Sequence, residues 1–175
     1  RVVEIPRLLW WFILNVVILR VRPKQSAAKY ATVWTDQGSP LKVWTEKQAA
    51  MLQGYLGERG HRVLVRPAMR YGAPAIASVL DELRSAGAIR VLVLPLYPQY
   101  SGPTTASVCD AVFEWGKRAR RLPEFRFVNQ YHDDPAYIGA LAKRVSDHWK
   151  HAGRAERLVL SFHGVPRRTL ILGDP

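Results

Sequence analysis

One histidine stands where a base or a metal ligand could act. His163 directly follows the apolar run 158–162, which we expect to be a buried strand, and Gly164 and Pro166 constrain the turn beyond it. In open parallel sheets, ligands bind at the carboxyl ends of the strands. A neutral imidazole there can accept a proton or bind a divalent metal ion. His163 is therefore the main catalytic candidate, and a structural histidine is the alternative.

Three other groups have simpler explanations than chemistry. Residues 132–134 (HDD) resemble metal ligands, but Asp134 suits the N-cap of a helix. His148 and His151 lie one helical turn apart, but no third metal ligand is expected near them, which favours solvated side chains. Cys109 falls among helical residues and is best explained as packed core.

The sequence has no phosphate-binding loop. Its only glycine cluster, at residues 54–60, lies at an expected helix end and lacks the spacing of a dinucleotide fingerprint. Aromatic residues instead follow two expected strands, at 69–72 (MRYG) and 95–101 (PLYPQYS). Aromatic walls without a phosphate cradle favour a flat hydrophobic ligand with polar edges.

The elements that must position these residues alternate regularly. We expect strands at 61–65, 89–94, 125–128 and 158–162. We expect helices opened by the pair Thr45 and Gln48, by Pro74, at 108–115, and by Asp134. This order predicts an α/β fold, a Rossmann-like parallel sheet with helices on both faces. All four strands should end on one edge of that sheet.

Composition places the chain among globular proteins. Of 175 residues, 48% are hydrophobic and 23% are charged, which excludes a disordered chain. One cysteine cannot form an internal disulfide, so we expect a reducing, cytoplasmic location.

The positive charge favours anionic partners. Lys and Arg number 26 against 14 Asp and Glu, a net charge of +12, with the densest runs at 117–121 and 20–24. Solvated surface charge is the alternative. Zinc-finger and RNA-recognition signatures are missing, so we expect no nucleic acid partner, and we consider peripheral membrane contact instead.

Residues 8–19 are apolar except for Asn15. About a dozen residues fall short of the roughly 20 that cross a bilayer. A segment without a polar face is either buried on all sides or faces an apolar cavity or membrane interface. Trp10, Trp11 and Phe12 could form a wall for a large flat ligand.

Long motifs along the whole chain resemble those of ferrochelatases of the proteobacterial type. They are 1–11 (RVVEIPRLLWW), 38–41 (GSPL), 45–48 (TEKQ), 69–72 (MRYG), 94–101 (LPLYPQYS) with 104–105 (TT), and 160–166 (LSFHGVP). The resemblance implies insertion of ferrous iron into protoporphyrin IX, the last step of haem biosynthesis, with release of two protons. Ferrous iron is then a substrate, and no organic cofactor is implied. A chelatase for cobalt or coproporphyrin, and a non-catalytic basic binding module, are the alternatives.

The resemblance also assigns residues. His163 corresponds to the active-site histidine of the family, which accepts a pyrrole proton, ligates iron, or does both. The residues that correspond to porphyrin-lining positions are Leu8, Trp10, Trp11, Tyr30, Ser39, Arg70, Tyr71, Tyr97 and Ser101.

The family fold has two similar Rossmann-like halves with the porphyrin between them. We expect residues 1–132 to form the first half without its first strand, with an aromatic lip at 1–22. Residues 133–175 would hold the connecting helix and the first strand of a truncated second half, ending in 173–175 (GDP). The acidic partner of His163, and any iron–sulfur ligands of the kind that some members carry, would lie outside this chain. We therefore expect the isolated chain to be inactive.

Overall fold

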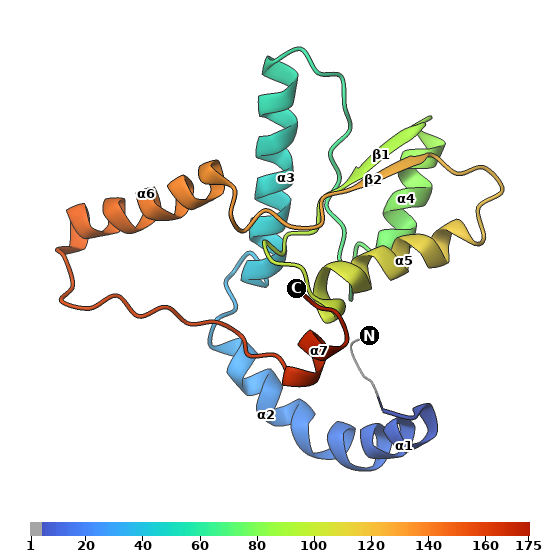
Figure 1. The fold of residues 1–175 in the computed structure, drawn as a ribbon, viewed down its shortest axis with the longest axis horizontal. Helices are drawn as coiled ribbons and strands as arrows, with labels where there is room; N and C mark the ends of the chain where they lie inside the picture. Colours follow the sequence, from blue (N-terminus) through green and yellow to red (C-terminus); the bar gives the residue numbers. More distant parts are fainter. Residues whose placement is uncertain (1–4) are drawn as a thin grey trace. The chain divides into compact units, whose positions relative to one another are not determined.

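The computed structural model describes residues 5–175, which form two compact units (Figure 1). One unit comprises the described residues up to Gly87, and the other runs from Ala88 to Pro175. The division expected at residues 132 and 133 stays a prediction about the complete protein.

The second unit contains the parallel sheet. Strands β1 (Arg90–Val93) and β2 (Glu124–Phe127) pair in parallel, with Val91 opposite Phe125. Helix α5 (Ser107–Gly116) connects them, as Figure 1 shows. A crossover helix between two parallel strands is the basic α/β unit. The α/β fold class and the strands expected at 89–94 and 125–128 are therefore confirmed.

One face of α5 forms the core of this unit. Val112 and Trp115 are 1% and 3% exposed. The Trp115 ring meets the Phe125 ring edge-on at 6.1 Å between centroids. Alternation along β2 turns Phe125 and Phe127 toward the helix and leaves Arg126 exposed. Apolar burial between α5 and the strands thus fixes the sheet edge where the following loops begin.

Helix α6 (Pro135–Ala152) has the N-cap that the sequence predicts. The Asp134 carboxylate accepts hydrogen bonds from the backbone N–H groups of Ala136 and Tyr137 at 2.9 and 3.1 Å. The helix ends at Gly153, whose φ of +82° suits glycine. The Asp134 carboxylate is therefore engaged in capping the helix. This weakens the hypothesis that residues 132–134 bind a metal ion, because one of the three proposed ligands already has a structural role.

The strand expected at 158–162 does not form within the described residues. The segment is extended but unpaired, and the Val159 and Phe162 side chains are 84% and 75% exposed. A strand needs a neighbour for its backbone N–H and C=O groups, and residues 5–175 supply none here. The short helix α7 (Arg167–Ile171) follows this segment.

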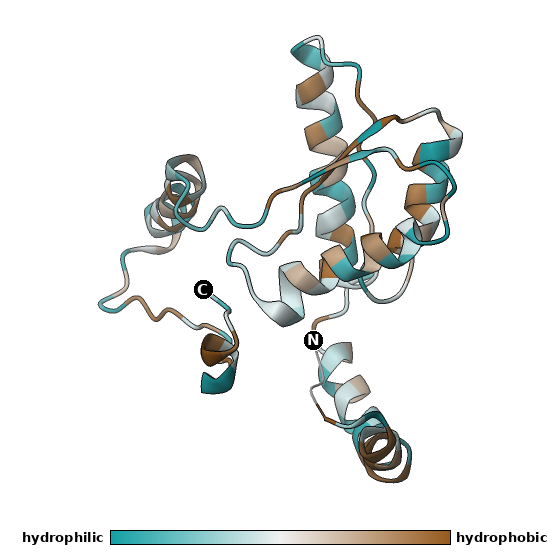
Figure 2. Ribbon diagram, turned by 45° about the vertical axis from the view of Figure 1, so that its right-hand side comes forward, coloured by the Kyte–Doolittle hydropathy of each residue, from teal (hydrophilic) through white to brown (hydrophobic). Residues whose placement is uncertain are grey.

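The first unit begins with one long helical run. It consists of α1 (Arg7–Phe12), the π-helical turn η1 (Ile13–Ile18) and α2 (Leu19–Ala31). Figure 2 shows its hydrophobic beginning in brown. Leu8 and Trp11 are 87% and 64% exposed, so the first of the two alternatives, burial on all sides, does not hold for the described residues.

Helix α3 (Pro40–Glu58) begins five residues before the predicted Thr45. The Ser39 hydroxyl accepts a hydrogen bond from the Lys42 backbone N–H, and Pro40 occupies the first turn. This pair is a stronger start than Thr45 and Gln48, because proline at N1 loses no helical hydrogen bond. Thr45 lies inside the helix, where its hydroxyl donates to the Leu41 carbonyl.

The strand expected at 61–65 is also unpaired within residues 5–175, and a side chain supplies two of the hydrogen bonds that a neighbouring strand would make. The Gln53 amide on α3 donates to the Val63 carbonyl and accepts from the Val65 N–H, both at 2.7 Å. Helix α4 (Ile76–Ser85) follows Pro74 by two residues. The described sheet therefore has two strands instead of the expected four.

In the described part of the chain, no helix combines the length and apolarity needed to span a membrane.

Candidate functional site

The loops after β1 and β2 lie against each other at the carboxyl edge of the sheet. The Val128 N–H donates to the Val93 carbonyl at 3.0 Å, and the Tyr131 N–H donates to the Pro98 carbonyl at 2.8 Å. The loop with Tyr97 is thus joined to the loop with Tyr131. For these two strands, the expected rim of tyrosine-bearing loops is confirmed.

Among the described residues, Tyr131 is the titratable side chain whose pKa is clearly shifted. Burial raises the pKa of its phenol, and the neighbouring Tyr137 raises it further. The two rings meet edge-on with centroids 5.4 Å apart. Tyr131 therefore stays neutral at physiological pH and can serve at this rim as a hydrogen-bond donor.

Ser101 lies on the same rim and has a partner that sequence reasoning missed. Its hydroxyl donates to the Asp174 carboxylate at 3.0 Å, and the Gly102 N–H donates to the same oxygen at 2.8 Å. The only sequence signal was the Gly173-Asp174-Pro175 tail, a combination typical of turns. Gly173 indeed has a φ of +102°.

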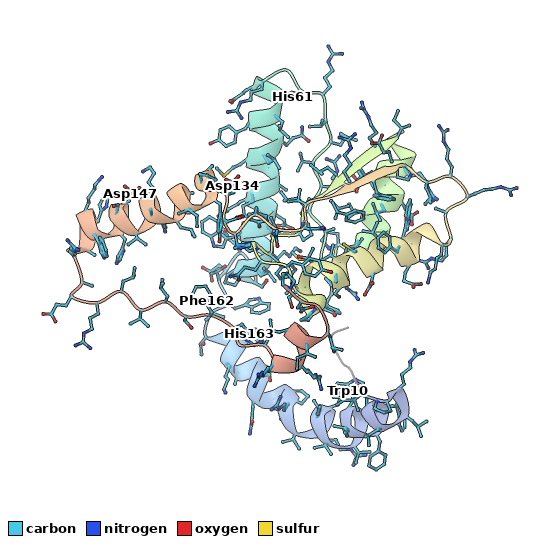
Figure 3. All side chains as sticks on the ribbon, viewed as in Figure 1. Trp10, His61, Asp134, Asp147, Phe162 and His163 are labelled. Atoms are coloured by element: carbon cyan, nitrogen blue, oxygen red, sulfur yellow. The ribbon has the colours of Figure 1, made fainter. Side chains whose placement is uncertain are left out.

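His163 lies on the extended segment ahead of α7, next to Phe162 (Figure 3). Its imidazole is exposed, so within these residues it is accessible to a ligand. Three residues further on, Pro166 is the N-cap of α7. The Pro166 carbonyl accepts hydrogen bonds from the N–H and hydroxyl of Thr169, at 2.9 and 2.8 Å.

The first unit carries the other aromatic and cationic candidates. The Arg70 guanidinium carbon lies 4.7 Å from the centroid of the Tyr71 ring, a cation–π contact, and Tyr71 is largely exposed. Tyr30 meets Trp34 edge-on at 6.5 Å. Arg70 and Tyr71 are thus held as a pair that offers both a charge and an aromatic face.

Helix α1 carries three further candidates. Leu8 and Trp11 are exposed and lie three residues apart on one face, while Trp10 is half-buried. The lip expected at 1–22 also includes residues 1–4, which lie outside the described residues. Ser39 has a structural role as the N-cap of α3.

The structure therefore divides the candidates between its units. Tyr97, Ser101 and His163 belong to the unit from Ala88 to Pro175. The other candidates, all in the unit that ends at Gly87, are Leu8, Trp10, Trp11, Tyr30, Ser39, Arg70 and Tyr71. Across residues 5–175, no three His, Cys, Asp or Glu side chains come together as a metal site. A metal ion would thus find fewer than three such ligands at any one place in this part of the chain.

Cys109 lines an open cavity of about 430 Å³ in the second unit. The cavity walls are Tyr100, Ala106, Cys109, Phe113, Phe127 and Asn129. Cys109 is half-buried in α5, near the fully packed Val108 and Val112. It therefore lies at the margin of the core instead of inside it.

An α/β chain with aromatic and histidine-bearing loops matches one known family along its entire length. The ferrochelatase family model matches residues 1–175. A ferrochelatase of Polaromonas sp. (strain JS666) is 69% identical over all 175 residues, which cover 48% of that protein. A ferrochelatase of Methylibium petroleiphilum is 70% identical, and one of Janthinobacterium sp. (strain Marseille) is 62% identical, with the same coverage.

The chain belongs to the ferrochelatase family. It spans about half the length of the curated relatives that it matches.

Proposed function

We propose that the complete protein inserts ferrous iron into protoporphyrin IX to form protohaem, as the last step of haem biosynthesis. The observation that carries this proposal is the match to the ferrochelatase family over every residue of the chain. Each turnover replaces two pyrrole N–H protons by one Fe²⁺ ion. The reaction therefore requires a macrocycle site, a path for iron and a base.

His163 is the proposed base and iron ligand. Histidine is the most common general base in proteins, so this imidazole can take a pyrrole proton and release it to water. Imidazole also suits divalent iron as a ligand. Its exposure on the segment before α7 is compatible with both roles.

The remaining candidates are proposed to hold the porphyrin. Leu8, Trp10 and Trp11 supply apolar surface for the macrocycle. The cationic Arg70, stacked on Tyr71, suits the anionic propionate edge. Tyr30, Ser39, Tyr97 and Ser101 supply hydroxyl groups to the same site.

The test is metal insertion by the complete protein, followed by absorbance without oxygen. His163→Ala should abolish haem formation but leave porphyrin binding, because one imidazole is a small part of the binding surface. His148→Ala is the matched control, because His148 is exposed on α6. Normal turnover by His163→Ala would remove His163 from the mechanism. Parallel assays with cobalt and with coproporphyrin distinguish this function from the related chelatases.

We also propose that these 175 residues alone do not insert metal. The matched relatives are about twice as long, and residues 5–175 bring no three His, Cys, Asp or Glu side chains together. The isolated chain and the complete protein should be compared at equal concentration with the same substrates. Haem formation by the isolated chain would contradict this proposal.

We place the protein in the cytoplasm, with peripheral contact to an anionic membrane. The single cysteine supports a reducing compartment. Charge supports the membrane contact, since the turn at 117–121 carries Lys117, Arg118, Arg120 and Arg121. Cell fractionation at low and high salt tests both points.

A further inference from the structure

The Asp174 carboxylate connects two segments that lie far apart in the sequence. One carboxylate oxygen accepts hydrogen bonds from the Ser101 hydroxyl and the Gly102 N–H, across 73 and 72 residues. Asp174 and its two partners are all half-buried. Hydrogen bonds to an ionised acceptor are stronger than those between neutral groups, and partial burial protects them from screening.

The fit around this carboxylate is close. A Cβ atom added at Gly102 would lie 3.3 Å from the other Asp174 oxygen, so the carboxylate occupies the space that a side chain would need. Ser101 precedes the π-helical turn η2 (Gly102–Ala106), but its side chain makes no capping hydrogen bond to that turn. Its hydroxyl donates to Asp174 instead.

The connection continues from Asp174 toward His163. The Asp174 N–H donates to the Thr169 carbonyl at 3.0 Å. Thr169 is 9% exposed, and both its N–H and its hydroxyl donate to the Pro166 carbonyl. Pro166 follows His163 by three residues. A continuous series of hydrogen bonds thus runs from the loop after β1 to the turn beside His163.

We propose that Asp174 is a positioning residue that holds the Tyr97–Ser101 loop and the His163 segment in one arrangement. This inference rests on the proposed function, since it assigns both segments to one active site. Asp174 acts through the residues that it holds. Loss of its carboxylate lets the two segments move independently, and small displacements of reacting groups lower rates strongly.

The test compares three variants of the complete protein. Asp174→Ala should lower kcat by about tenfold or more, because His163 and the porphyrin loop lose their fixed relation. Asp174→Asn should recover most of that loss, because its amide oxygen still accepts from Ser101 and Gly102. Ser101→Ala removes one of the two bonds to the carboxylate and should fall between them.

Asp147→Ala is the matched control. Asp147 is on α6 with Lys143 and Lys150 as its ion-pair partners, and it lies in Figure 3 on a helix that carries none of the site candidates. This variant also removes one aspartate carboxylate, but it leaves the hydrogen bonds between Ser101, Asp174, Thr169 and Pro166 in place. Equal kcat for Asp174→Ala and Asp147→Ala in an active protein would overturn the proposal, as would a failure of Asp174→Asn to exceed Asp174→Ala.

Hydrogen exchange gives a second readout that does not depend on turnover. In Asp174→Ala, the hydrogen-bonded amides of Gly102, Thr104 and Ala106 on one side and of Thr169 on the other should exchange faster, and Asp174→Asn should restore their protection. Unchanged exchange would overturn the proposal even if activity fell. An inactive wild-type protein would contradict the proposed function alone, and exchange would then decide whether Asp174 joins the two segments.

Discussion

At the scale of single residues, Tyr131 shows how the sheet edge alters a side chain. Its backbone N–H is fixed to the loop after β1, and its ring is held edge-on against Tyr137. The folded protein therefore retains the phenolic proton to a higher pH than the unfolded chain does. That difference makes stability depend on pH in the alkaline range.

We predict that stability falls as pH rises through about 10, where the unfolded tyrosine begins to lose its proton while the folded one keeps it. Tyr131→Phe should flatten this decline, because phenylalanine does not titrate. Urea unfolding between about pH 8 and pH 11 measures the effect. Tyr55→Phe, at an exposed site on α3, is the control and should leave the decline unchanged. Parallel declines for wild type and Tyr131→Phe would contradict the prediction.

At the residue level, the sequence points to His163 as a candidate, which stays a prediction, but it does not point to the hydrogen bonds of Asp174. His163 stands directly after an apolar run, and that neighbourhood is visible in the sequence itself. The partners of Asp174 lie 72 and 73 residues away, and no spacing rule links such distant positions. Pairing across that distance is decided by tertiary structure alone.

At the scale of elements, the extended segment 61–65 depends on one side chain. Gln53 supplies both a donor and an acceptor to it, as a neighbouring strand would. Gln53 is half-buried on α3, so its two bonds are partly shielded from water.

Gln53→Ala should lower the free energy of unfolding by about 1–3 kcal/mol, since it leaves the Val65 N–H and the Val63 carbonyl without their partner. Gln48→Ala is the matched control, because Gln48 is exposed on the same helix. Chemical denaturation of both variants measures the difference. An equal effect of the two substitutions would show that the Gln53 bonds do not stabilise the segment.

The elements that the sequence predicted well are those with local causes. Helix α6 follows from the Asp134 cap, and β1, α5 and β2 follow from apolar patterns that pack on one another. The start of α3 was wrong because two capping signals competed within six residues. The runs at 61–65 and 158–162 have strand-like sequences, but strand pairing also requires a neighbour, which apolar periodicity cannot supply.

At the scale of the whole molecule, the chain has a large excess of positive charge. The net charge is +12, and part of it gathers at the turn between α5 and β2. Lys117 is paired with Glu114 at 2.6 Å. Arg118, Arg120 and Arg121 are exposed and form no ion pair within residues 5–175. The neighbouring Leu122 is 55% exposed, so the turn offers both charge and an apolar side chain.

We predict that the complete protein binds vesicles containing phosphatidylglycerol and that salt weakens this binding. The combined substitution Arg118→Ala, Arg120→Ala and Arg121→Ala should reduce it about tenfold or more, since each basic residue near an anionic surface contributes about 1 kcal/mol. Co-sedimentation measures the bound fraction. The control removes the same charge from α6 through Lys143→Ala, Arg144→Ala and Lys150→Ala. Equal losses from both sets, or binding insensitive to salt, would contradict a role for the turn.

The unpaired segment at 158–162 has a consequence for handling the protein. Its backbone can accept another strand on either edge, and its sequence (LVLSF) carries no charge and no proline. Short stretches of this kind seed cross-β aggregates when they are left uncovered. A recombinant preparation of these 175 residues should consequently aggregate as its concentration rises. A charged substitution at Val159 should reduce this aggregation.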